Sequence, residues 1–139
     1  MDVGFTQTLA YLLGLGKGLK GLKLALDGDL GAGKTYFVRA LLEAMEPGLG
    51  LQVTSPSFAL CNRYVGSEFE IDHFDLYRLE DPQELEETGL FESLDDPGRI
   101  SLVEWAGKFK GVVPQCNFLL QIEITPTGRA YKIKEIQAN

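Results

Sequence analysis

Residues 28–35 read GDLGAGKT, and this stretch constrains the fold more than any other part of the chain. It fits the phosphate-loop pattern G-x-x-x-x-G-K-[ST] at every fixed position. In such a loop the glycines allow a tight turn, so that successive backbone N–H groups converge on a phosphate. Lys34 would supply a charge that reaches the β- and γ-phosphates of a nucleotide, and the Thr35 hydroxyl would be placed to ligate Mg²⁺.

The segments on either side of this loop have the periodicity that a phosphate loop needs. Residues 22–27 alternate in the manner of a strand. After the loop, Phe37, Leu41 and Ala44 recur at helical spacing, and the Pro-Gly pair at 47–48 predicts the end of that helix. A glycine-rich turn can match the pattern by chance. The order of strand, loop and helix favours a working phosphate loop instead.

Composition restricts the possible function further. The chain has 139 residues, and we expect residues 1–139 to form a single P-loop ATPase domain. Its formal charge of −7 argues against a surface that binds nucleic acid directly. Cys61 and Cys116 are too few for a disulfide framework and are interpreted as buried thiols. The apolar run at 9–15 is too short for a signal or a membrane span, which predicts a cytoplasmic protein without membrane contact.

The rest of the chain predicts a mixed α/β sheet of the P-loop NTPase type. We expect a parallel core, antiparallel pairs at the margins and helices on both faces, with the nucleotide beyond the carboxyl ends of the parallel strands. Thr6 or Thr8 could cap a first helix, and Asp81 could cap another that ends at Gly89. Residues 14–21 read as a loop. Besides 22–27, the expected strands are 52–54, 58–64, 68–74, 100–103, 118–124 and 130–136.

Acidic residues at the ends of two predicted strands could complete a nucleotide site. Glu104 ends the apolar run 100–103, where a second Mg²⁺ partner is usual, although it could also be a solvated strand terminus. Asp75, which ends the other candidate strand, is the second candidate, and it could hold the metal's water shell or orient the attacking water. His73 lies on the same strand face as Asp75 and could either take part or serve as a structural hydrogen-bonding group.

Three further features remain open from the residues alone. Tyr77 and Arg78 are either surface residues or part of a loop that responds to the γ-phosphate. Ser55-Pro56-Ser57 is either a plain proline turn or a switch loop whose hydroxyls reach the γ-phosphate.

Four motifs together resemble the TsaE (YjeE) family. They are GDLGAGKT at 28–35, SPSF at 55–58, HFDLYRL at 73–79 and VEW at 103–105, in this order over nearly the whole chain. The HFDLYR block and the Glu-Trp pair are more specific than the phosphate loop. Departures from the family pattern are Tyr36 and Ser57, where threonine is common, and Ala106, where proline is frequent.

The resemblance implies a small bacterial ATPase required for N6-threonylcarbamoyladenosine at position 37 of tRNAs that read codons beginning with A. It implies ATP and Mg²⁺ as ligands and the TsaB–TsaD complex as the partner, which ATP hydrolysis would reset between turnovers. The tRNA would then be held by the partners, which agrees with the acidic charge of this chain.

The resemblance also assigns roles to residues. Lys34, Asp75 and Glu104 are the expected catalytic residues, with Asp75 as the candidate for positioning water. Thr35 and Glu104 match the Mg²⁺ ligands, and Trp105 would shape the site, the docking surface or simply the core. The expected nucleotide-binding residues are Gly28, Leu30, Gly31, Ala32, Gly33, Lys34, Thr35 and, from a weaker match, Arg129.

Two other function classes fit the sequence less well. A nucleotide-gated binding module would use ATP as an allosteric ligand, with incidental turnover. A small-molecule kinase would need a basic lid over the transferred phosphoryl group, and the five arginines are scattered without an Arg-rich insertion. An open site without an arginine finger predicts slow hydrolysis by the chain alone and stimulation by partners.

Overall fold

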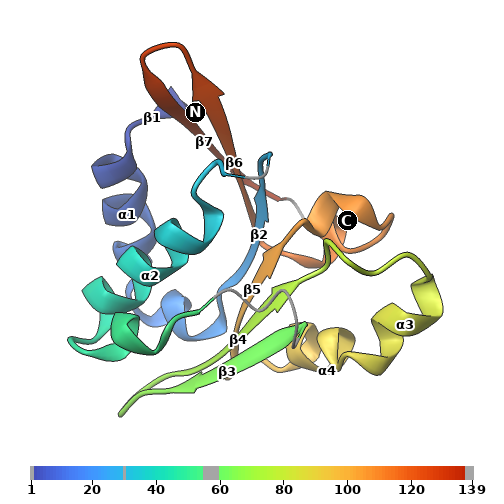
Figure 1. The fold of residues 1–139 in the computed structure, drawn as a ribbon. Coiled ribbons are helices and arrows are strands. Elements are labelled where there is room, and N and C mark those ends of the chain that lie inside the picture. The colour runs from blue at the N-terminus through green and yellow to red at the C-terminus, as the bar shows by residue number, and fades with distance from the viewer. Residues whose placement is uncertain (1, 30, 55–59, 137–139) are drawn as a thin grey trace.

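The structure is a computed structural model, and it describes residues 2–29, 31–54 and 60–136. In this part of the chain seven strands form one sheet in the order β1-β7-β6-β2-β5-β4-β3 (Figure 1). The strands are β1 (Asp2–Val3), β2 (Lys23–Asp27), β3 (Cys61–Val65), β4 (Glu70–Asp75), β5 (Ile100–Glu104), β6 (Phe118–Thr125) and β7 (Gly128–Glu135).

The pairing confirms the expected mixed sheet. β2 pairs in parallel with β5 and β6, and β4 pairs in parallel with β5. The hairpins β3–β4 and β6–β7 and the short strand β1 add antiparallel pairs at the two margins. The carboxyl ends of β2, β4 and β5 therefore meet at one edge of the sheet, where ligands bind in open α/β folds.

Helices cover both faces of the sheet, as expected (Figure 1). α1 (Phe5–Leu13) and α2 (Lys34–Met45) pack on one face, and α3 (Pro82–Glu87) and α4 (Leu90–Asp95) on the other. Short 3₁₀ turns connect these elements: η1 (Gly16–Gly21), η2 (Leu49–Gln52), η3 (Ala106–Lys108) and η4 (Val113–Gln115). Among the helices of the described residues, none has the length and apolar character of a membrane span.

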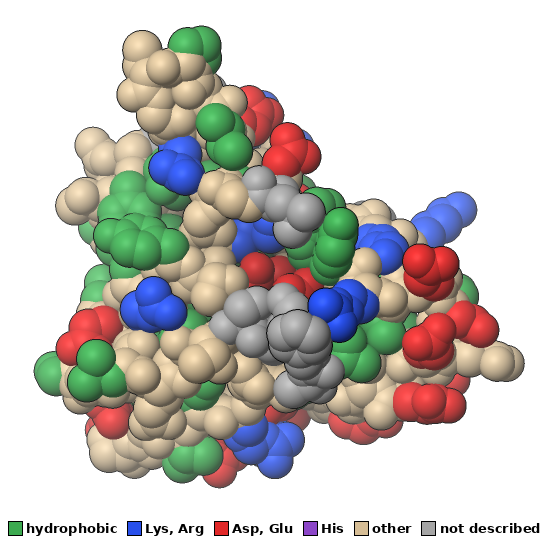
Figure 2. All heavy atoms as spheres, viewed as in Figure 1, with side chains coloured by type: hydrophobic (Ala, Val, Ile, Leu, Met, Phe, Trp, Pro, Cys, Tyr) green, Lys and Arg blue, Asp and Glu red, His purple; other side chains and the backbone are tan. Residues whose placement is uncertain are grey.

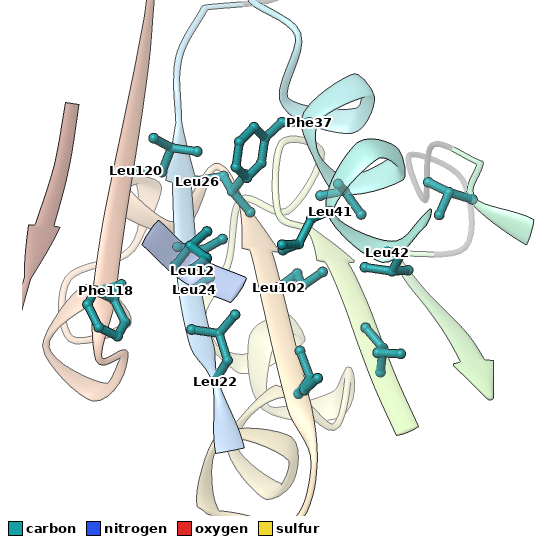
Figure 3. Close-up of a cluster of buried hydrophobic side chains, with 14 of the residues drawn as sticks. Leu12, Leu22, Leu24, Leu26, Phe37, Leu41, Leu42, Leu102, Phe118 and Leu120 are labelled. Carbon is teal, nitrogen blue, oxygen red and sulfur yellow. The ribbon is translucent and has the colours of Figure 1, made fainter. Parts of the chain in front are cut away.

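Burial on both faces explains why the central strands read as continuous apolar runs. Leu24 and Leu26 of β2 lie in one cluster with Leu41 and Leu42 of α2 (Figure 3). Ala25 packs into the cluster on the opposite face. Leu102 and Val103 divide in the same way on β5. These two clusters fix β2 and β5 from both sides, so the residues at their carboxyl ends have little freedom to shift.

Several local predictions were wrong or incomplete. Gly4, not Thr6 or Thr8, is the N-cap of α1, and the Thr8 hydroxyl donates to the Gly4 carbonyl from inside the helix. Residues 49–52 form η2, and Gln52–Thr54 is not a strand. The expected loop at 14–21 contains η1.

The helix start at Asp81 is confirmed, since its carboxylate accepts a hydrogen bond from the Gln83 N–H. α3 nevertheless ends at Glu87, and Gly89 (φ 83°) is the N-cap of α4, which the sequence analysis missed. A glycine in the left-handed region can stand at either end of a helix, so it was read as a terminator only.

Both cysteines are free thiols, and their environments predict slow chemistry. Cys116 is buried, as expected, whereas Cys61 is half-buried. Burial raises the pKa of Cys61 to about 11 and that of Cys116 to about 12. Because the thiolate is the reactive form, we expect both to react with iodoacetamide at pH 8 at least ~100-fold more slowly than in the urea-unfolded chain. Equal rates in the folded and unfolded chains would contradict this environment.

Candidate functional site

The phosphate loop joins the end of β2 to the start of α2, and two of its glycines are required by geometry. Gly33 has φ 103° and is the N-cap of α2, a backbone conformation that other residues adopt at a cost. Gly28 lies against the neighbouring strand β6, where a Cβ atom would come within 2.5 Å of the Ile122 carbonyl oxygen. The fixed glycines of the motif therefore serve the loop's packing as well as its turn.

Lys34 begins α2 and folds back over the loop. Its Nζ donates to the carbonyl oxygens of Gly28 at 2.5 Å and Asp29 at 3.1 Å. The same ammonium lies 4.4 Å from the centre of the Trp105 ring, within range of a cation–π interaction. The side chain is 5% exposed, and this burial lowers the pKa of Lys34 against the opposing effect of nearby carboxylates, Glu104 first.

Thr35 and Glu104 meet at the junction of α2 with the end of β5. The Thr35 hydroxyl donates to Glu104 Oε2 at 2.9 Å, with Oε1 at 3.2 Å. Adjacent ligands of an octahedral Mg²⁺ with bonds of 2.0–2.1 Å are ~2.9 Å apart, so these two oxygens have a spacing that the ion accepts. The described residues include no group of three His, Cys, Asp or Glu side chains that could hold a metal. Mg²⁺ is usually held by one or two protein oxygen ligands, with waters and phosphate oxygens completing its shell.

Asp75 and His73 reach the same region from β4. Asp75 is opposite Glu104 in the parallel register, is 6% exposed, and accepts a hydrogen bond from the Tyr77 N–H at 3.0 Å. His73 is fully buried, and its Nε2 lies 2.5 Å from Glu104 Oε2. The expected acidic residues are thus brought together, with His73 behind Glu104 rather than at the surface.

Arg129, from the distant start of β7, also contacts the phosphate loop. Its Nε donates to the Ala32 carbonyl at 2.7 Å and its Nη2 to the Gly31 carbonyl at 3.0 Å. The guanidinium therefore holds the outer backbone of the loop. Leu30 and the segment Ser55-Pro56-Ser57-Phe58 lie outside the described residues.

Two hollows border the loop, and among the residues that line them the sequence analysis did not single out Asp27 and Lys108. One, of about 540 Å³, is lined by the rings of Tyr77 and Trp105 and by Lys108, Asp27 and Asp29. The other, of about 390 Å³, lies between the loop and residues 121–124 of β6. Figure 2 shows acidic and basic side chains side by side in the depression at the centre of this face. Asp27 could have been predicted, since it ends β2 directly before the loop.

Comparisons with known proteins agree with one another. A family profile described as "Threonylcarbamoyl adenosine biosynthesis protein TsaE" matches residues 4–133. A protein of Haemophilus influenzae described as tRNA threonylcarbamoyladenosine biosynthesis protein TsaE is 41% identical over 112 residues, which are 79% of this chain and 68% of that protein. A protein of Borreliella burgdorferi with the same description is 33% identical over 94% of this chain and 90% of its own length.

A solved structure shares the fold. The crystal structure of YdiB from Bacillus subtilis superposes with a TM-score of 0.64 and 26% identity, over 99% of this chain and 86% of that one. Other relatives with the TsaE description match over only 45% to 60% of their own length. The chain therefore spans about half of those proteins.

The close approach at Gly28 generates a stability prediction. We expect Gly28→Ala to lower the free energy of unfolding by about 1–3 kcal/mol, because the new methyl group meets a strand carbonyl that has no room to move. Urea denaturation measures this change. The matched control is Gly98→Ala, whose Cβ would be 3.6 Å from its nearest neighbour, the Asp96 carboxylate. Equal stability of the two variants would contradict the packing of the loop on β6.

Proposed function

Because the chain belongs to the TsaE family, we propose that it is a P-loop ATP hydrolase that assists formation of N6-threonylcarbamoyladenosine at position 37 of tRNAs reading codons that begin with A. It would act in the cytoplasm as one ATPase domain over residues 1–139. It would dock on the TsaB–TsaD complex and reset that complex by hydrolysing ATP. The chain's charge of −7 supports indirect contact with tRNA, through the partners.

The observation that carries the proposal is the contact between Thr35 and Glu104 beside Lys34. A hydroxyl from the first turn of α2 contacts a carboxylate from the end of β5, and the loop lysine directly before that hydroxyl is close enough to the carboxylate for its pKa to be affected by it. These are the groups that phosphate-loop enzymes use for Mg²⁺ and for the β- and γ-phosphates. Here they come from segments about 70 residues apart, and the parallel pairing of β2 with β5 brings them together.

Each of the expected site residues would then have a distinct role. Gly28, Leu30, Gly31, Ala32 and Gly33 would present backbone N–H groups to the phosphates, aided by the positive end of α2. Lys34 would exchange its two carbonyl partners for β- and γ-phosphate oxygens. Asp75, a buried carboxylate beside Glu104, would orient the attacking water.

Thr35 and Glu104 would hold Mg²⁺, which when bound would neutralise the negative charge that develops on the phosphates. Arg129 would support the loop from outside, because its guanidinium contacts loop carbonyls. With Arg129 engaged in this way, transition-state charge would be stabilised by a group from the partner, and the chain alone would hydrolyse ATP slowly.

We expect TsaB–TsaD to raise the steady-state rate of ATP hydrolysis by the full chain at least tenfold, since a supplied arginine finger is worth ~10³–10⁵ in related enzymes. Glu104→Gln should remove ~10²-fold or more of the stimulated rate, because a group that stabilises transition-state charge is lost. Phosphate release measures both effects. The matched control is Glu86→Gln, a change at an exposed position of α3.

Other outcomes of this experiment would distinguish an ATP hydrolase from a nucleotide-gated binding module. Tight ATP binding without turnover, alone or with TsaB–TsaD, would contradict the hydrolase and favour a nucleotide-gated binding module. Stimulated turnover that survives Glu104→Gln would leave the hydrolase in place and remove Glu104 from the metal site.

A further inference from the structure

Behind Glu104 lies a hydrogen-bonded series of buried side chains, and its members beyond Glu104 have no part in the proposed reaction. His73 Nε2 is 2.5 Å from Glu104 Oε2, and a carboxylate can only accept, so Nε2 donates this hydrogen bond. On the other side of the ring, His73 Nδ1 lies 3.1 Å from the Tyr64 hydroxyl. Glu104, His73 and Tyr64 are all at most 3% exposed.

The three residues of this hydrogen-bonded series come from three strands. Glu104 is on β5, His73 on the adjacent β4, and Tyr64 on the edge strand β3. The Tyr64 hydroxyl also lies 3.1 Å from the Thr54 carbonyl oxygen, and its single proton is shared between that oxygen and His73 Nδ1, which accepts because Nε2 carries the ring proton. Asn62, also on β3, donates to the Thr54 hydroxyl at 3.1 Å. The orientation of the histidine ring is therefore fixed at both nitrogens.

These contacts restrict the orientation of the Glu104 carboxylate and leave His73 no free nitrogen. Oε2 is shared between the Thr35 hydroxyl and His73 Nε2, so two donors from different elements define the plane of the carboxylate. His73 has both nitrogens occupied and no exposed surface, so it has no free group for substrate or water. These contacts favour the structural hydrogen-bonding role, one of the two that the sequence left open for it.

A contribution to folding stability is a weak explanation for the contacts between Glu104, His73 and Tyr64. Moving charged and polar groups into a protein interior costs free energy, and their mutual attraction often does no more than offset that cost. Apolar side chains of similar volume would stabilise the fold at least as well. Partners of this kind behind a metal ligand orient it and tune its basicity, and their loss typically lowers metal affinity or activity 10–100-fold.

We propose that His73 and Tyr64 are positioning residues that hold Glu104 in the orientation required for Mg²⁺. Tyr64 acts through His73, and His73 acts through the Glu104 carboxylate. The inference rests on the proposed function, since it concerns the same metal site. It assigns a role to Tyr64, which the phosphate-loop motif and the acidic strand ends do not indicate.

The test is a Mg²⁺ titration of nucleotide binding by the full chain, with AMP-PNP as the probe. The chain has one tryptophan, Trp105, whose ring borders Lys34, so intrinsic fluorescence can report binding. We expect His73→Leu to raise the Mg²⁺ midpoint ~10-fold or more and Tyr64→Phe to raise it severalfold. His73→Gln should restore much of the loss, because its amide can still donate to Glu104.

Affinity for AMP-PNP in EDTA should remain within about twofold in every variant, because the loop and Lys34 are unchanged. This readout distinguishes positioning of the metal ligand from general disturbance of the site. Tyr11→Phe is the matched control, since it removes a phenol hydroxyl from a partly exposed ring that packs on Phe118 in another part of the fold.

Unchanged Mg²⁺ midpoints in folded His73→Leu and Tyr64→Phe would overturn the inference. An equal loss of affinity with and without Mg²⁺ would overturn it as well. If His73→Leu does not fold, Tyr64→Phe alone decides. If Glu104→Gln shifts the midpoint and the His73 and Tyr64 variants do not, the inference fails while the proposed function stands. If the unaltered chain binds no AMP-PNP, the proposed function fails and the inference with it.

Discussion

The parallel pairing of β2 with β5 is the constraint on which the candidate site depends. It aligns Leu26 with Glu104, so the phosphate loop leaves the sheet beside the carboxylate that faces its first helical turn. Apolar clusters on both faces hold the two strands in this register, and Figure 3 shows the cluster on the α2 face. A slip of one residue would turn Glu104 to the other face and separate it from Thr35. Core packing therefore sets the distance between the candidate metal ligands.

Much of this arrangement could be predicted because it follows local rules. The central strands are buried on both sides and read as apolar runs, and the phosphate loop has a fixed pattern, so β2, α2, β5 and Glu104 lie where the sequence indicates. The contact of Tyr64 with His73 follows no such rule, because it depends on the register of β3 against β4. Arg129 reaches the loop only through the long β6–β7 hairpin.

Trp105 shows how backbone conformation and electrostatics combine at the site. It directly follows Glu104 and has φ 60°, a left-handed conformation that a bulky side chain adopts at a cost of order 1–3 kcal/mol. Its N–H donates to the Leu26 carbonyl, so the turn is tied to the end of β2. The turn brings the indole ring over the Lys34 ammonium and next to the Tyr77 ring. The strained residue thus supplies one wall of the depression beside the loop.

The resting contacts of Lys34 set a condition on any ligand of this loop. The ammonium is nearly buried, and its carbonyl partners and the Trp105 ring compensate only part of its lost hydration, so its pKa is lowered. A neutral ligand would gain little by drawing it away from these contacts. Phosphate oxygens are ionised acceptors and form hydrogen bonds roughly twice as strong as those to neutral carbonyls. The loop lysine therefore favours anionic ligands before any other group of the site makes contact.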